Sequence, residues 1–170
     1  MKQLLAIVGL IGIVAGLSAA ALAARSGDGD KQAIAALEQR IVKGAEAKDA
    51  NAILANFAKG DALVVFDVIP PRECRGREAY LKNWQSALAG CADNPTMEID
   101  DLAIETEGTL AYSHSIQRFA CTDSKGNKSA VTLRATDVYR KVDGKWWIVH
   151  EHYSVPVDLD TAKADLNSKP

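Results

Sequence analysis

Two runs rich in β-branched and aromatic residues flank Asp143-Gly144 within the stretch 134–154. An Asp-Gly pair between two such runs is among the strongest short-range signals for a β-hairpin. His150 and His152 lie on the second predicted strand, and His114 lies on an earlier one. Because side chains alternate along a strand, His150 and His152 share one face of the sheet. The hairpin therefore predicts a sheet that carries a cluster of polar side chains on one face.

The rest of the chain shows helical patterns first and β-type patterns afterwards. Apolar residues recur at helical spacing after Asp30, a candidate N-cap, and again after Asp49 and Gly76. Three helices are thus predicted over residues 30–48, 49–60 and 76–89. Strands are predicted over residues 62–69, 97–107, 110–121, 129–142 and 146–155, with a β-bulge at Asp100-Asp101. This order predicts an α+β cone in which three N-terminal helices pack on a curved antiparallel sheet.

The N-terminal segment has the features of an export signal. A positive start at Met1-Lys2 precedes an apolar run that ends in the small-x-small pattern Ala21-Leu22-Ala23. We predict a signal peptide over residues 1–23, cleaved after Ala23 or Ala24, and a periplasmic or secreted protein without membrane contact after cleavage. The run is nearly long enough to span a bilayer, so an uncleaved anchor is the alternative. The remaining boundaries predicted are a flexible tether over 24–30, one folded domain over 31–157 and a polar C-terminal tail over 158–170.

Charge and cysteine content narrow the partners and the compartment. The net charge is −2 and no basic block is present, so nucleic acid is not expected as a partner. Three cysteines in an exported chain allow one disulfide. If the strands near Met97 and Leu110 pair as a hairpin, Cys121 comes close to Cys91. We therefore favour a Cys91–Cys121 bridge over a pairing of either with Cys74, and three buried thiols are the alternative.

The last predicted strand is apolar on both faces. Trp146 and Ile148 lie on one face, and Trp147, Val149 and Tyr153 lie on the other. A sheet with one face in water should instead alternate apolar and polar side chains. We therefore expect a second copy of the chain to cover the outer face, in a homodimer packed sheet to sheet.

The histidines and one aspartate are the residues that could carry chemistry. His-x-His with a third histidine could hold zinc, but no further ligand is clearly placed on that face, so no metal is predicted. The histidines can instead be structural hydrogen-bonding groups, or His114 can act as an acid or base in a pocket. Asp67 is a candidate general base if it faces an apolar pocket, and an ordinary strand-end residue otherwise. No P-loop or dinucleotide fingerprint occurs, so no cofactor is predicted.

The segment Asp143-Gly-Lys-Trp-Trp-Ile-Val-His-Glu-His-Tyr-Ser154 resembles the last hairpin of the NTF2-like superfamily. It is most similar to the SnoaL-like and ketosteroid-isomerase-like proteins and to the association domain of calcium/calmodulin-dependent protein kinase. Ile69-Pro-Pro71, the segment 76–84 and Ala111-Tyr-Ser-His114 fit the same superfamily, so the resemblance covers roughly residues 31–157. It implies the cone fold. It leaves the function open, because this fold hosts isomerases, dehydratases, cyclases, ligand binders and oligomerisation modules.

The resemblance also implies which strands line the cone. It places His114 on a pocket-lining strand, and Trp84 would supply an apolar wall from the third helix. A two-residue turn at Asp143-Gly144 would place Arg134 opposite Tyr153, and a three-residue turn would place it opposite His152. We prefer the three-residue turn, because one connected polar patch then forms from Arg134, Thr136, His150, His152 and Ser154. In the kinase association domain, however, pocket arginines fall where this chain has Asp137 and Tyr153, so the histidine face can also be the structural one.

Three functions therefore remain open. The first is a protein that holds a small apolar or anionic ligand in the cone, lined by Trp84, Tyr112 and His114, with Arg134 or the paired His150 and His152 as polar anchor. The second is a cofactor-independent isomerase or lyase that uses His114 or Asp67 as acid or base. The third is a non-catalytic homo-oligomerisation module.

Overall fold

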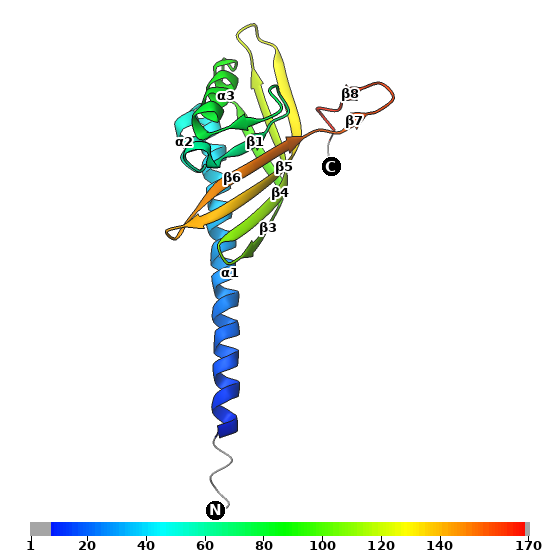
Figure 1. The fold of residues 1–170 in the computed structure, drawn as a ribbon. Coiled ribbons are helices and arrows are strands. Elements are labelled where there is room, and N and C mark those ends of the chain that lie inside the picture. The colour runs from blue at the N-terminus through cyan, green and yellow to red at the C-terminus, as the bar shows by residue number, and fades with distance from the viewer. Residues whose placement is uncertain (1–7, 169–170) are drawn as a thin grey trace, which may run out of the picture.

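The computed structural model describes residues 8–168, and the side chains of residues 27–168. Its helices are α1 (Val8–Glu46), α2 (Ala50–Leu54), the 3-10 helix η1 (Gly60–Ala62) and α3 (Arg77–Ala89). Its strands are β1 (Val64–Phe66), β2 (Cys74–Arg75), β3 (Thr96–Glu107), β4 (Leu110–Thr122), β5 (Lys128–Val142), β6 (Lys145–Ser154), β7 (Val157–Asp158) and β8 (Lys163–Ala164). Figure 1 shows α1 running along the domain and well past its end, with the sheet wrapped around its C-terminal part. None of the helices in the described part of the chain has a stretch long and apolar enough to cross a membrane.

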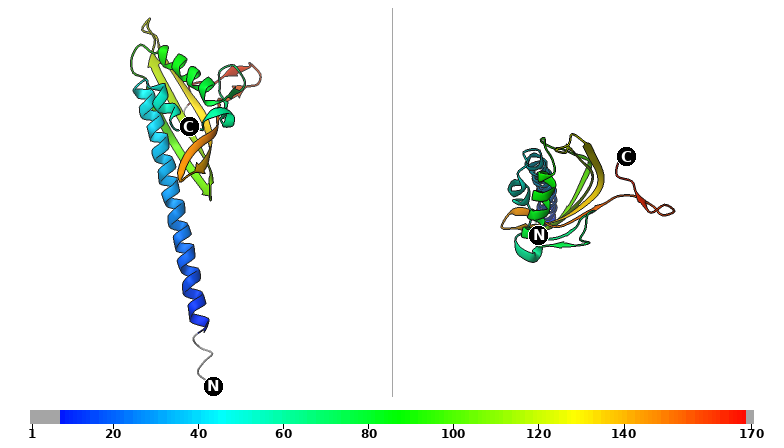
Figure 2. Two further views of the ribbon diagram at one scale, coloured as in Figure 1. Left: turned by 60° about the vertical axis from the view of Figure 1, so that its left-hand side comes forward. Right: turned by 90° about the horizontal axis from the view of Figure 1, so that it is seen from above.

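The main sheet is curved and mixed. Its six strands follow the order β2-β1-β6-β5-β4-β3, and β3 to β6 form an antiparallel meander. β1 pairs in parallel with β6, so the prediction of a purely antiparallel sheet is wrong at this edge. Seen from above, the sheet curls around the helices, which lie on its concave side (Figure 2). The α+β architecture predicted from the sequence is thus confirmed, and the concave side becomes the interior of the cone.

Helix α1 forms the central part of the core. Its apolar positions Ile34, Leu37, Ile41 and Ala45 are at most 2% exposed, as the helical spacing predicts. Each large aliphatic side chain buried in this way contributes about 1.5–3 kcal/mol. Asp30 is not an N-cap, because the helix continues through it to Val8. The Asp30 carboxylate instead accepts hydrogen bonds from Lys141 Nζ (2.6 Å) and Trp146 Nε1 (3.1 Å), which fixes α1 to the last hairpin.

The N-terminal boundaries of the sequence analysis fall partly in this helix. Residues 1–7 of the predicted signal peptide lie outside the described residues, and the segment predicted as a tether, 24–30, is helical. Cleavage and export stay predictions.

Helices α2 and α3 begin where the sequence predicts. The Asp49 side chain accepts a hydrogen bond from Ala52 N (3.0 Å) and caps α2, as predicted. Gly76 has a φ of +89° and immediately precedes α3. A Cβ at this position would lie 3.2 Å from Asp61 Oδ1, so both the backbone angle and the space favour glycine.

Bulges determine which side chains face the interior. The predicted bulge in β3 is confirmed by a register shift between Asp100 and Ala103. The last hairpin has a two-residue turn, with Val142 opposite Lys145, so the preferred three-residue turn is wrong. A second shift at Val138/Tyr139 leaves Val149 as the extra residue on β6. Arg134 therefore lies opposite Ser154, which neither predicted register gave.

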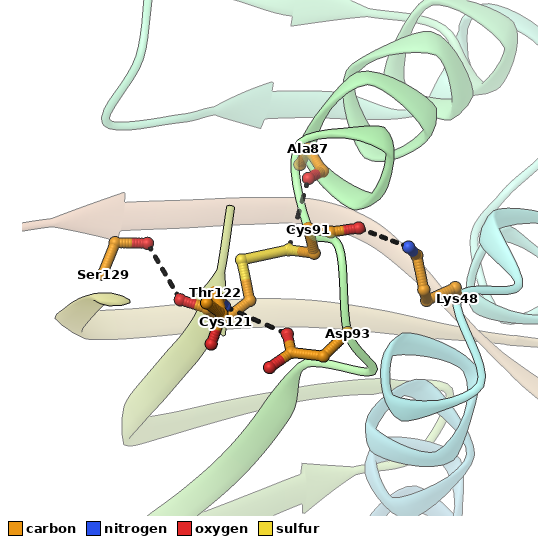
Figure 3. Close-up of a disulfide and its surroundings, with 7 residues drawn as sticks. All are labelled: Lys48, Ala87, Cys91, Asp93, Cys121, Thr122 and Ser129. Carbon is orange, nitrogen blue, oxygen red and sulfur yellow. Dashed lines mark hydrogen bonds between the residues drawn. A yellow bond between two sulfur atoms is a disulfide. The ribbon is translucent and has the colours of Figure 1, made fainter. Parts of the chain in front are cut away.

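The Cys91–Cys121 disulfide is present, so this prediction is confirmed, and Cys74 is a buried free thiol. The bridge joins Cys91, two residues after the end of α3, to Cys121 near the end of β4 (Figure 3). Around it, Lys48 Nζ donates a hydrogen bond to Cys91 O, and Thr122 N donates one to Asp93 Oδ1 (3.0 Å). Helix and sheet are thus held together at one end of the cone.

The polar tail begins with ordered structure. β7 and β8 form a small separate hairpin, and Thr132 N donates a hydrogen bond to Leu166 O (2.8 Å) beside β5. Leu159 at its tip is 92% exposed, so the hairpin adds little to the core.

Candidate functional site

The register divides the sheet into an inner face toward the helices and an outer face away from them. Tyr139 marks the inner face of β5, because its hydroxyl donates a hydrogen bond to Glu38 Oε1 on α1 (2.7 Å). The same face carries a row of polar side chains on β4 to β6, namely Ser113, Ser115, Gln117, Asp137, Glu151 and Tyr153. All of these are buried. The interior of the cone is therefore polar along its centre.

A cavity of about 170 Å³ lies between α3, the segment after β1 and the inner face of the sheet. Aliphatic and aromatic side chains form most of its wall, and a few polar groups interrupt it. The lining residues are Asp67, Val68, Ile69, Tyr80, Asn83, Trp84, Ala87, Met97, Gln117, Arg118, Phe119, Val131, Leu133 and Tyr153. Of the predicted site residues, Asp67 and Trp84 border this cavity.

Aromatic rings form one side of the cavity. Trp84 packs edge-to-face on Tyr80, with ring centroids 6.4 Å apart, and on Phe119, with centroids 6.3 Å apart. This geometry places the positive edge of one ring against the negative face of the next and holds the rings in fixed orientations. Trp84 Nε1 is buried and has no acceptor among the described residues. This side of the cavity is thus apolar, except for the Trp84 Nε1–H group, which has no acceptor among the described residues.

Asp67 brings a carboxyl group to the cavity. It follows β1 directly, and its side chain accepts a hydrogen bond from Val68 N (2.7 Å). Partial burial raises the pKa of Asp67, against the effect of hydrogen bonds from Val68 and Ile69. Burial raises the pKa because removing water disfavours the charged form. Asp67 can therefore accept a proton more readily than an exposed aspartate.

A hydrogen-bonded group of Tyr80, Tyr153, Gln117 and Glu151 lies at the inner end of the cavity. Tyr80 donates to Glu151 Oε2, and the Tyr153 hydroxyl lies 3.1 Å from Gln117 Oε1 and 3.0 Å from Glu151 Oε1. One hydroxyl carries one proton, so both Tyr153 contacts are hydrogen bonds only if Glu151 is protonated and donates to Tyr153. Burial raises the pKa of Glu151 to about 8, which agrees with this arrangement.

Two further carboxyls continue the network toward α1. Asp137 lies opposite Glu151 on the neighbouring strand, and burial, followed by the nearby Glu38 and Glu151, raises its pKa well above the usual range. Burial also raises the pKa of Glu38 to about 7. Ser113 Oγ lies 2.7 Å from Tyr139 Oη, and Tyr139 in turn donates to Glu38. A chain of buried acids and hydroxyls thus extends from the cavity to α1.

The other predicted site residues lie on the outer face, so the expectation that they line the cone is wrong. Tyr112 is 49% exposed, and His114 and Arg134 are also exposed. His150 Nδ1 lies 2.9 Å from Val64 O, and the Phe66 ring packs edge-on against both His150 and His152. Within the residues whose side chains are described, no group of three or more His, Cys, Asp or Glu could hold a metal ion.

The extra residue Val149 accounts for the reversal of His150 and His152. Without a bulge, His150 and His152 would share a face with Trp146 and Ile148, which are buried against the core. One inserted residue moves every following side chain to the opposite face. The residues missed in the sequence analysis are Glu38, Tyr80, Gln117, Glu151 and Tyr139. The signal that could have found part of the site was the alignment of Asp137 and Tyr153 with pocket positions of the kinase association domain, and the structure places both on the inner face.

Comparison with known proteins agrees with this architecture. A family model described as a SnoaL-like domain matches residues 34–158. An NTF2-like protein of unknown function from Pseudomonas putida is 30% identical over 84% of this chain and 98% of its own, with a TM-score of 0.74. A proposed calcium/calmodulin-dependent protein kinase II association domain from Xanthomonas campestris is 24% identical over 71% of this chain and 84% of its own, with a TM-score of 0.62.

A more distant structure has the same fold. A proposed scytalone dehydratase from Novosphingobium aromaticivorans is 17% identical over 75% of this chain and 85% of its own, with a TM-score of 0.67. No curated protein matches the chain. At an identity of 17%, the likeness shows a shared fold alone and gives no information about the reaction.

Proposed function

Because this chain belongs to the SnoaL-like domain family and has an NTF2-like fold, we propose that it binds a small organic molecule in the cavity beside α3. The observation that supports this most is the composition of the cavity wall, which is mostly apolar with a few polar groups such as Asp67 and Tyr80. Small-molecule sites have this combination, in which apolar area supplies affinity and a few polar groups fix orientation. An engineered apolar cavity of about 150 Å³ holds benzene, so a volume of about 170 Å³ suits a ligand with one ring.

Tryptophan fluorescence provides the test, since Trp84 borders the cavity and the other two tryptophans, Trp146 and Trp147, do not. Titration of small ring compounds should change the emission in a saturable way. Trp84→Phe should remove this change, whereas Trp147→Phe, on the outer face, should retain it. A saturable change that survives in Trp84→Phe would place the ligand elsewhere, and the absence of any saturable change would favour the oligomerisation module.

A second candidate function is proton transfer on the bound molecule, as in a cofactor-independent isomerase or lyase. The observation that favours it is Asp67, a half-buried carboxyl with a raised pKa at the edge of an apolar cavity. Such a group can remove a carbon-bound proton from a ligand held against it. His114 was the other candidate base, but its place on the outer face leaves this role to Asp67.

Exchange of carbon-bound hydrogen with deuterated water tests this second function. Asp67→Asn keeps the shape of the side chain and removes the base, so exchange on a carbonyl ligand should fall by at least about 100-fold. Ligand binding, followed by Trp84 emission, should persist in the variant. Exchange that continues at the wild-type rate in Asp67→Asn would rule out Asp67 as the base.

A further inference from the structure

One carboxyl group lies at the cavity and another lies directly behind its wall. Asp67 borders it, and Glu151 lies directly behind Tyr80 and Tyr153. The ion pairs among the described side chains are Lys31–Glu105, Arg75–Glu73 and Lys141–Asp30, none of which includes a carboxyl of the cavity. Arg118 is the basic residue in the lining, but it also borders an outer groove with Asp93 and makes no ion pair with Asp67. The carboxyl at the cavity therefore has no basic partner in the described part of the chain.

The hydroxyl groups of the cavity offer acceptors rather than donors. Tyr80 gives its proton to Glu151, and Tyr153 gives its proton to Gln117 when Glu151 is protonated. Each phenol oxygen keeps a lone pair, but neither has a proton left for a ligand. The lining also has N–H donors on Trp84, Asn83, Gln117 and Arg118, which can bind an acceptor atom of the ligand. The acceptor groups best suit a ligand with N–H donors.

The aromatic wall has the same electrostatic preference. Trp84, Tyr80 and Phe119 border the cavity, and the face of an aromatic ring carries the negative part of the quadrupole, which attracts cations. Aromatic rings beside an unpaired carboxylate are a combination that binds organic ammonium groups.

We propose that the ligand of this cavity is a small organic amine, whose ammonium group lies beside Asp67 and whose apolar part packs against Trp84. This inference rests on the proposed binding function and specifies the class of ligand. Asp67 supplies the counter-charge, and the tyrosine oxygens supply further acceptors. An anionic ligand of the same size would be repelled by the Asp67 carboxylate, and Arg118 is the basic side chain of the lining that could offset this repulsion.

The test is a matched series of three ring compounds titrated calorimetrically into the purified protein. Benzylamine, benzyl alcohol and benzoate have similar size and carry a positive, a neutral and a negative group. Benzylamine should bind roughly tenfold or more tightly than benzyl alcohol, because a hydrogen bond between charged groups is worth more than a neutral one. Asp67→Asn should remove this preference, so that benzylamine and benzyl alcohol bind the variant with similar affinity. Asp93→Asn, outside the cavity, is the control and should behave as the wild type.

The outcomes separate this inference from the proposed function. Equal affinity for benzylamine and benzyl alcohol, or a preference for amine that Asp67→Asn retains, would overturn the amine assignment and leave a binding cavity. Tightest binding of benzoate would also overturn it and assign recognition to Arg118. Failure of all three compounds to bind would count against the amine and the binding function together.

Discussion

Glu151 controls the state of the polar groups at the inner end of the cavity. It accepts a hydrogen bond from Tyr80 and contacts Tyr153, and it is 2% exposed. A neutral carboxyl satisfies both contacts, whereas an ionised one leaves a buried charge without a basic partner in the described residues. The raised pKa values of Glu151 and Glu38, about 8 and about 7, follow from this burial. The buried Glu151 carboxyl therefore keeps its proton in the folded protein at neutral pH.

We predict that the protein loses stability as the pH rises from about 5 to about 8. In this window Glu151 keeps its proton in the folded state and loses it on unfolding, so the folded state binds more protons. Each such proton lowers the free energy of unfolding by about 1.4 kcal/mol per pH unit. Asp30 has a lowered pKa and acts in the opposite direction, but only below its ordinary value of 3.8. Urea unfolding at several pH values measures the slope.

Glu151→Gln provides the matched variant for this prediction. The amide can accept from Tyr80 and donate to Tyr153 at every pH, so the variant should be more stable than the wild type at pH 8 and similar to it at pH 5. Wild-type stability that rises with pH over this range would show that Glu151 is ionised in the folded protein.

At the scale of elements, the boundaries of β3 to β6 were predictable, whereas the short strands β2, β7 and β8 and the facing of β6 were not. The structure confirms three features that have a local sequence pattern, namely the turn at Asp143-Gly144, the bulge near Asp101 and the start of α3 after Gly76. The bulge at Val149 has no such sequence pattern, because β6 is apolar on both faces and a shift of one residue leaves its apolar pattern unchanged. His150 and His152 were therefore predicted on the face that lines the cavity, and they lie on the outer face.

The disulfide links two elements that form the cavity wall, α3 and β4. We predict that reduction of Cys91–Cys121, which are 30 residues apart, lowers the free energy of unfolding by about 3–4 kcal/mol through loop-closure entropy. Because α3 then loses its fixed attachment to β4, affinity for the ligand should fall as well. Unfolding and ligand titration with and without dithiothreitol measure both effects. Cys74→Ala removes the free thiol and should lose as much stability and affinity on adding dithiothreitol as the wild type. If a Cys91→Ser/Cys121→Ser variant lost the same amounts, the bridge would be excluded as the cause.

At the scale of the whole molecule, the α+β cone was predictable because helical patterns precede β-type patterns, and the family was predictable from the resemblance of the last hairpin. The parallel pairing of β1 with β6 was not, since a three-residue strand is too short to show an alternation. The export of the protein stays a proposal, which rests on the apolar run before Arg25 and the small residues that end it. Mass spectrometry of the protein from its host should find a chain that begins at Ala24 or Arg25.

The outer face of the sheet leads to a prediction of assembly. Tyr112 is 49% exposed there, and Val138, Trp147 and His150 are only partly buried. We expect a homodimer packed through this face, with twice the mass of one chain in sedimentation. Tyr112→Glu should shift the protein to the monomer, and Leu159→Glu, on the hairpin tip away from the sheet, should not. A monomeric wild type at high micromolar concentration would contradict the dimer.

The central claim is that the cavity beside α3 is the ligand site. The most direct test is a high-resolution crystal structure of the protein isolated from its own host without added ligand. We predict density for a small molecule in contact with Trp84 and Asp67, and mass spectrometry of the extract would identify its class. A cavity closed by its own side chains, or a ligand bound on the outer face beside His114 and Arg134, would contradict the claim.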